Sequence, residues 1–139
     1  RPYFFEIERS HKNHERLRRR FFAYGHLLSQ SGEQAVGEVY QRAFGVQPAR
    51  GMAVFIGADR RHAEGLRAVA QSVVKRSTEI WFTSLDQLLE ERERKRQDGQ
   101  PCRGRNGQPL VEEVPIIPTD FFERDLLVNL SGKPGRLVV

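Results

Sequence analysis

Apolar and polar side chains alternate along residues 3–8. A period of two is typical of a β-strand, because successive side chains point to opposite faces. One face therefore carries three apolar side chains, and Phe4 shares the other face with Glu6 and Glu8. The pattern predicts a strand whose second face ends in two acidic residues.

Apolar residues then recur at steps of four, three and four, which is the spacing of an amphipathic α-helix. These residues are Leu17, Phe21, Tyr24 and Leu28. Ser10 precedes them as a candidate N-cap, so we expect a first helix over residues 11–29. A weaker apolar stripe follows the capping-box spacing of Ser31 and Gln34 and ends at Gly45, which predicts a short second helix.

The segment from Met52 to Ile56 is an almost continuous apolar run. Such a run is typical of a strand that is buried on both faces in a parallel sheet. Asp59 is a candidate N-cap for a third helix, whose apolar residues keep helical spacing as far as Val73. Residues 79–83 are rich in aromatic and β-branched side chains and predict the next strand.

A fourth helix is expected after this strand. Ser84 and Gln87 repeat the capping-box spacing, and three leucines lie close behind Ser84. The charged run from Glu90 to Arg96 is then the end of that helix, extending into solvent.

The rest of the chain carries weaker signals. Residues 98–109 are rich in Gly, Pro, Arg and Gln without periodicity, so we expect an exposed loop there. Residues 110–117 favour an edge strand interrupted by Pro115, and residues 126–130 and 137–139 favour further short strands. We expect no internal repeat at a fixed period.

Alternating strands and helices joined by right-handed crossovers predict an α/β fold with a mixed or parallel central sheet flanked by helices. We divide the chain into a core (1–97), an exposed loop (98–109) and a C-terminal extension (110–139) that forms an edge strand or an arm. Because the chain begins with Arg1 and a strand follows almost at once, we interpret it as a processed product or a piece of a longer protein.

Composition narrows the class of protein. The chain has 139 residues with 23 Lys and Arg against 18 Asp and Glu, a net charge of +5, which fits one domain. No apolar run approaches the roughly 18 residues that span a bilayer, and Cys102 is a single cysteine, so we expect a soluble cytoplasmic protein without membrane contact. The sequence pI of about 9.9 favours a polyanionic partner such as nucleic acid.

Glu6 and Glu8 are the first candidates for chemistry. Two carboxylates on one strand face project together and can share Mg²⁺ or Mn²⁺. The alternative is a structural role, either at a solvated strand end or in ion pairs with nearby arginines. The spacing alone leaves both interpretations open.

Basic residues are the second candidates. Helical phase directs Arg20 towards the edge of the sheet, where it can pair with Glu6 or Glu8 or stabilise charge on a phosphate. Other arginines point outward, either as phosphate contacts or as ordinary solvated side chains. The outward set comprises Arg16, Arg18 and Arg19 on the first helix and Arg103 and Arg105 in the loop. His11 and His14 are at helical spacing for a transition-metal pair, but no third ligand has suitable spacing, so we interpret them as surface residues.

Two segments resemble a known family. Residues 4–10 read Phe-Phe-Glu-Ile-Glu-Arg-Ser, and residues 17–24 read Leu-Arg-Arg-Arg-Phe-Phe-Ala-Tyr. This order, with the later strands at 53–56 and 80–86, resembles the nuclease-like domain of the plasmid replication-relaxation family. The resemblance covers residues 3–90 and implies a distant member of the restriction-endonuclease-like superfamily.

That resemblance implies roles for particular residues. Glu6 takes the place of the acid on the catalytic strand, and Glu8 takes the place of a lysine. Because a carboxylate cannot replace a cation, Lys12 or Arg20 would have to reach the same pocket from the following helix. No Asp precedes Glu6, so a complete site would need an acid from elsewhere.

The sequence therefore predicts a DNA-acting, nuclease-like domain of a plasmid or mobile-element replication or mobilisation protein. Metal-dependent phosphodiester hydrolysis is one form of this activity. The alternative is a non-catalytic module on the same fold that binds DNA or assembles with other replication or mobilisation proteins. The sequence does not determine the oligomeric state.

Overall fold

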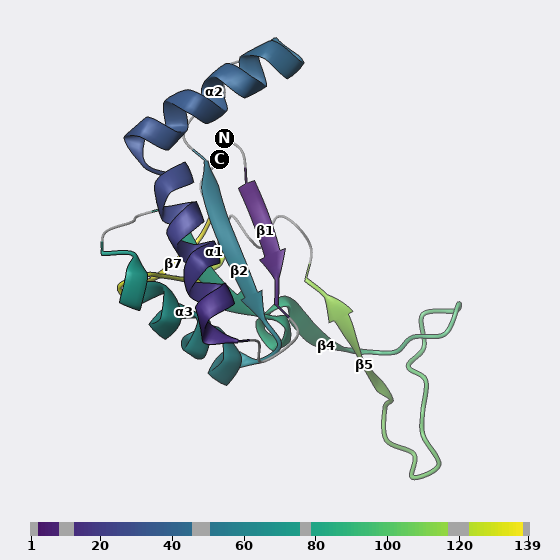
Figure 1. Ribbon diagram of the computed structural model, residues 1–139. Helices are drawn as coiled ribbons and strands as arrows, with labels where there is room; N and C mark the ends of the chain where they lie inside the picture. The colour runs from purple at the N-terminus through teal and green to yellow at the C-terminus, as the bar shows by residue number, and fades with distance from the viewer. Residues whose placement is uncertain (1–2, 9–12, 46–50, 76–78, 117–122, 138–139) are drawn as a thin grey trace.

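Three parallel strands form the centre of the fold in the computed structural model (Figure 1). They are β1 (Tyr3–Ile7), β2 (Met52–Gly57) and β3 (Ile80–Ser84). Two antiparallel strands, β6 (Leu127–Asn129) and β7 (Pro134–Gly135), extend the sheet to the order β1-β2-β3-β6-β7. The structure describes residues 3–8, 13–45, 51–75, 79–116 and 123–137.

Three helices connect these strands: α1 (His14–Leu27), α2 (Gln30–Phe44) and α3 (Arg60–Val73). Buried residues of α1 and α3 pack in one cluster with residues of β2 and β3, so both helices cover the same face of the sheet. This is the geometry expected of two successive right-handed crossovers in one direction. The predicted α/β fold with a mixed sheet flanked by helices is confirmed.

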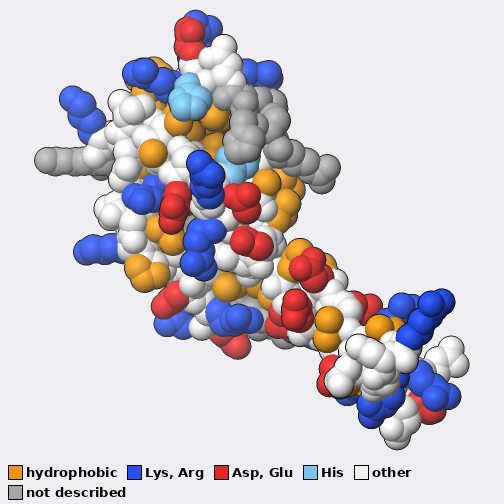
Figure 2. Space-filling model, turned by 90° about the horizontal axis from the view of Figure 1, so that it is seen from below, with side chains coloured by type: hydrophobic (Ala, Val, Ile, Leu, Met, Phe, Trp, Pro, Cys, Tyr) orange, Lys and Arg blue, Asp and Glu red, His pale blue; other side chains and the backbone are white. Residues whose placement is uncertain are grey.

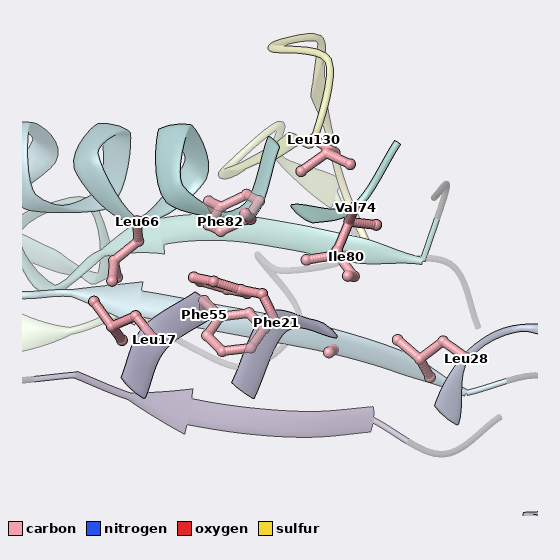
Figure 3. Packing of buried hydrophobic residues seen from close by; sticks show 11 residues of the cluster. Leu17, Phe21, Leu28, Phe55, Leu66, Val74, Ile80, Phe82 and Leu130 are labelled. Carbon is pink, nitrogen blue, oxygen red and sulfur yellow. The ribbon is translucent and has the colours of Figure 1, made fainter. Parts of the chain in front are cut away.

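The main core lies between those helices and the sheet (Figure 3). Phe21 of α1 is fully buried, and its ring centre lies 4.6 Å from that of Phe55 on β2. Phe82 of β3 stacks beside Phe55 at 5.9 Å. Leu17 and Leu28 complete the buried stripe of α1, which confirms the helical period found in the sequence.

A second, smaller cluster covers the other face of the sheet. Met52, Val54 and Ile56 of β2 pack there against Leu127 and Leu137. The alternation of β1 leaves two side chains on this side about half exposed. They are Phe5 at 52% and Ile7 at 53%.

The helix starts are set by side-chain caps. Asn13, rather than Ser10, caps α1 by accepting a hydrogen bond from the Glu15 N–H at 3.0 Å, and Ser10 lies outside the described residues. Asp59 caps α3 as predicted, accepting from the His62 N–H at 2.7 Å. Each cap satisfies a backbone donor that the first turn of a helix leaves without a partner.

The predicted fourth helix is wrong. Only a short 3-10 turn, η1 (Leu85–Leu88), follows Ser84, and the Ser84 side chain makes no capping hydrogen bond to the backbone. The hydroxyl of Ser84 instead bonds to the side chains of Asp86 and Gln87. The charged run that we expected as a helix end begins with β4 (Leu89–Glu93), which pairs with β5 (Val111–Pro115). Strand pairing with a distant segment therefore outweighs local helix propensity here.

The antiparallel pair β4–β5 continues into an arm that projects away from the sheet (Figure 1). The predicted exposed loop at 98–109 lies at the end of this arm, and the predicted edge strand is β5, which pairs with β4. The predicted strand near 126–130 is β6, which joins the main sheet. Within the described ranges, no helix combines the length and apolar character that crossing a bilayer requires.

The arm end contains two similar turn sequences. Asp98-Gly99-Gln100-Pro101 recurs eight residues later as Asn106-Gly107-Gln108-Pro109. Both segments form the same turn, and the second residue of each is a glycine at positive φ (82° and 74°). Matching hydrogen bonds close each turn, from the Arg96 N–H to the Gln100 carbonyl at 2.7 Å and from the Gly104 N–H to the Gln108 carbonyl at 2.9 Å. Two copies of four residues are a local similarity confined to the arm, so the expectation of no repeat at a fixed period stays a prediction.

Candidate functional site

The two predicted carboxylates lie at the carboxyl end of β1, on the face covered by α1. Glu6 is opposite Phe55 of β2 in the parallel register, and the Glu8 N–H donates to the Ile56 carbonyl at 3.0 Å. The Glu8 side chain is only 3% exposed, whereas that of Glu6 is 33% exposed. The alternation of the strand therefore brings the two carboxylates together, as predicted.

Arg20 of α1 binds both carboxylates. One of its guanidinium nitrogens, Nη1, donates to Glu8 Oε2 at 3.0 Å and lies 3.7 Å from Glu6 Oε2. A buried carboxylate is costly without compensation, and the Arg20 guanidinium places an opposite charge beside Glu8 inside the fold. The sequence left several roles open for the two acids, and in the structure both form ion pairs with Arg20.

Tyr24 completes the cluster one helical turn beyond Arg20. Its hydroxyl donates to Glu6 Oε1 at 2.6 Å. Burial, then the hydrogen bond to Glu6 and the charge of Glu6, raise the pKa of Tyr24 well above its ordinary value of 10.0, and Arg20 opposes this shift. The phenol is therefore held protonated as a hydrogen-bond donor, which is unlike an activated phenolate nucleophile.

From the sequence we expected Tyr24 only in the apolar stripe of the helix. The signal that could have revealed its second role is its spacing. Tyr24 lies four residues after Arg20, so both side chains share one side of α1 and reach the same strand. We name Glu6, Glu8, Arg20 and Tyr24 the carboxylate cluster.

The carboxylate cluster fits a divalent cation in donor chemistry but not in its present arrangement. Glu6 and Glu8 offer the hard oxygen ligands that Mg²⁺ and Mn²⁺ prefer. Arg20 occupies the space between those ligands, and a cation would have to displace it. In the part of the chain that the structure describes, no three His, Cys, Asp or Glu side chains are grouped as a metal site.

A hollow of about 570 Å³ lies beside the first turns of α1 and α3. Asp59, Arg61 and His62 line it together with His14. His62 is buried, and its Nδ1 accepts a hydrogen bond from the Ala58 N–H at 3.1 Å, so this imidazole braces the turn between β2 and α3. His62 lies in the first turn of α3, and its burial is not evident from the spacing of the sequence. His11 lies outside the described residues.

The outward arginines of α1 form a separate surface. Arg16, Arg18 and Arg19 are all exposed, and Arg19 pairs with Glu15 at 2.7 Å. Arg18 and Arg19 line a shallow hollow of about 300 Å³ with Phe22, whose side chain is 68% exposed. We name Arg16, Arg18, Arg19 and Phe22 the α1 basic face. Phe22 was missed as a site residue, although its spacing from Arg18 places it on the outer side of the helix.

The remaining predicted site residues are elsewhere. Arg103 and Arg105 are exposed at the end of the arm, away from the sheet that carries the carboxylate cluster (Figure 1). Arg103 donates to the Gly107 carbonyl at 2.8 Å. Lys12 lies outside the described residues, so its predicted reach towards Glu6 stays a prediction. Basic and acidic side chains are interspersed on the end of the molecule to which β1 and β2 point (Figure 2).

Comparisons of the chain with protein-family models, with curated proteins and with solved structures find no match. The resemblance to the plasmid replication-relaxation family therefore stays a prediction, as does the restriction-endonuclease-like fold.

Proposed function

We propose that this chain is a DNA-binding α/β domain of a cytoplasmic plasmid or mobile-element replication or mobilisation protein. The observation that carries the proposal is the α1 basic face, where Arg18 and Arg19 lie beside the exposed ring of Phe22. Guanidinium groups bind phosphates, and an exposed aromatic ring offers a surface on which an unpaired base can stack. The combination supports nucleic acid over other polyanions.

In this proposal the carboxylate cluster is structural. Arg20 neutralises Glu8 and part of the charge of Glu6, so the cluster ties α1 to β1 and fixes the orientation of the α1 basic face. Phosphates are then bound by Arg16, Arg18 and Arg19, and by Arg103 and Arg105 on the arm. Other replication or mobilisation proteins are the expected assembly partners of such a domain.

The second candidate is metal-dependent phosphodiester hydrolysis on a nuclease-like fold. The observation in its favour is the convergence of Glu6 and Glu8 on one face with a cation beside them. In that case both carboxylates would hold Mg²⁺ or Mn²⁺, which supplies charge stabilisation at a scissile phosphate. Arg20 or Lys12 would contact the phosphate instead of the acids.

One gel separates the two candidates. Supercoiled plasmid is incubated with the full chain at low salt, with Mg²⁺, with Mn²⁺ or with chelator. We expect retardation that persists in chelator, and no nicking. Replacing two residues of the α1 basic face, Arg16→Gln with Arg18→Gln, should weaken retardation more than the matched control, Arg42→Gln with Lys133→Gln, which removes the same charge elsewhere.

Two results would decide against the binding proposal. Metal-dependent nicking that disappears in the Glu6→Gln variant would establish the nuclease. A plasmid that is neither retarded nor cut would remove both DNA functions and leave an interaction with other proteins.

A further inference from the structure

The arm carries its charges in two separate zones. Its base, formed by residues 89–93 and 110–116, has five acidic residues and one basic residue, a net charge of −4. Its tip, formed by residues 94–109, has five basic residues and one acidic residue, a net charge of +4. Figure 2 shows Asp and Glu side chains along the base and Lys and Arg side chains gathered at the tip.

The tip is an ordered platform. Three backbone hydrogen bonds form a closed ring: from the Cys102 N–H to Arg94, from the Leu110 N–H to Cys102 and from the Arg94 N–H to Leu110, at 2.7, 2.7 and 2.8 Å. The two repeated turns extend from this ring. Because the turns are closed by their own hydrogen bonds, the backbone from which the basic side chains extend is already ordered, which lowers the entropy cost of binding.

The basic side chains surround a hollow of about 540 Å³ between the turns. Arg96, Gln100 and Arg103 line it together with Pro101 and Cys102. Arg96 lies 3.6 Å from Asp98, and Arg103 donates to the Gly107 carbonyl at 2.8 Å. Two guanidinium groups and an amide at one hollow are donors suited to phosphate oxygens.

We infer that the arm binds duplex DNA with its tip rather than with its side, and that a backbone phosphate of the DNA lies in the hollow between the two turns. This inference rests on the proposed DNA-binding function and specifies how the arm would meet the duplex. The acidic base excludes a side-on approach, because its glutamates repel the phosphate backbone. The major groove is about 8.5 Å deep and admits a two-stranded ribbon. Each of the two turns is a short ribbon of this kind, bridged at Lys95–Pro101 and at Arg103–Pro109, so one turn can enter the groove while the acidic base remains outside.

The test measures fluorescence anisotropy of a labelled DNA duplex with the full chain over a series of salt concentrations. In the tip variant, Lys95→Gln with Arg105→Gln, we expect affinity at low salt to fall about tenfold or more. The slope of log affinity against log salt should become shallower by about two, roughly one for each lost phosphate contact. The charge-matched control, Arg42→Gln with Lys133→Gln, should keep the slope of the unaltered chain.

A second tip variant, Arg96→Gln with Arg103→Gln, removes the guanidinium groups at the hollow and should lose at least as much affinity. Tip variants that bind as tightly as the control, in a chain whose binding the α1 substitutions abolish, would overturn the inference and leave the proposed function intact. Loss of binding in the tip variants but not in the α1 variant would support the inference and remove the role of the α1 basic face. Tip-dependent binding of polyglutamate in place of DNA would indicate an acidic protein partner and overturn the inference.

Discussion

Glu8 is a buried carboxylate that forms an ion pair with Arg20, and 3% and 28% of the two side chains are accessible. Because Glu8 is buried, the stability of the fold depends on the Arg20 side chain that pairs with it. Removing one member of a buried pair leaves the other without compensation, which costs more than the pair contributes when both are present.

The first prediction concerns that ion pair. Replacing Arg20 by Met should lower the free energy of unfolding by about 2–4 kcal/mol, because Glu8 then loses its guanidinium partner inside the fold. Arg18→Met on the outer side of the same helix should change it by less than about 0.5 kcal/mol. Urea denaturation of both variants provides the comparison, and equal losses would show that Glu8 does not depend on Arg20.

The second prediction concerns alkaline pH. The raised pKa of Tyr24 means that this phenol ionises more readily in the unfolded chain than in the folded one. Its contribution to stability is therefore complete below about pH 10 and is lost as the pH rises towards the folded-state pKa. Unfolding measured at about pH 8 and about pH 11 should show a smaller alkaline loss of stability in Tyr24→Phe than in the unaltered chain. An identical loss would mean that Tyr24 is not held protonated.

At the scale of elements, α3 packs closely on the end of β2 because the residue at the contact, Gly57, has no side chain. A Cβ on Gly57 would lie 2.7 Å from the Ala63 backbone nitrogen, closer than two such atoms can approach. The close packing of α3 on the carboxyl end of β2 therefore requires a glycine at position 57.

The third prediction follows from this contact. Gly57→Ala should lower the free energy of unfolding by about 1–3 kcal/mol through overpacking against α3. Gly65→Ala in the same helix has open space around its new Cβ, and it should raise that free energy by about 0.5–1 kcal/mol by improving helix propensity. Thermal unfolding of the two variants should shift in opposite directions, and a neutral Gly57→Ala would contradict the packing.

The arm gives an element-scale prediction of its own. Glu91 faces Glu113 across β4 and β5, whereas Arg92 faces Glu112. Like charges directly opposite destabilise a strand pair and opposite charges stabilise it, by roughly 0.2–1 kcal/mol. Glu113→Lys should therefore slow amide exchange in β4, and Glu112→Lys should accelerate it. Faster exchange in both variants would mean that this strand register is wrong.

Much of the element pattern could be predicted because burial in these elements follows a simple period. The alternation of residues 3–8 places Glu6 and Glu8 together, and helical phase brings Arg20 to them. The β4 strand could not be predicted in this way, because it depends on pairing with β5, about twenty residues later. Tyr24 was also missed as a site residue, because its place in an apolar stripe indicated a core ring, although its spacing from Arg20 puts both side chains on one side of α1.

At the scale of the whole molecule, the net charge of +5 is distributed unevenly. The carboxylate cluster is compensated internally by Arg20. The α1 basic face and the arm tip present exposed arginines, and the acidic base of the arm separates the tip from the body. A polyanion is therefore expected to meet the protein at these two surfaces rather than over its whole area.

The fifth prediction gives the most direct test of DNA binding through exposed arginines. The affinity of the unaltered chain for a DNA duplex is measured in chelator at increasing salt concentration. The account predicts tight binding at low salt and a linear fall of log affinity with log salt, by about 0.9 for each phosphate neutralised. Absence of binding at the lowest salt, or an affinity that does not change with salt, would contradict it.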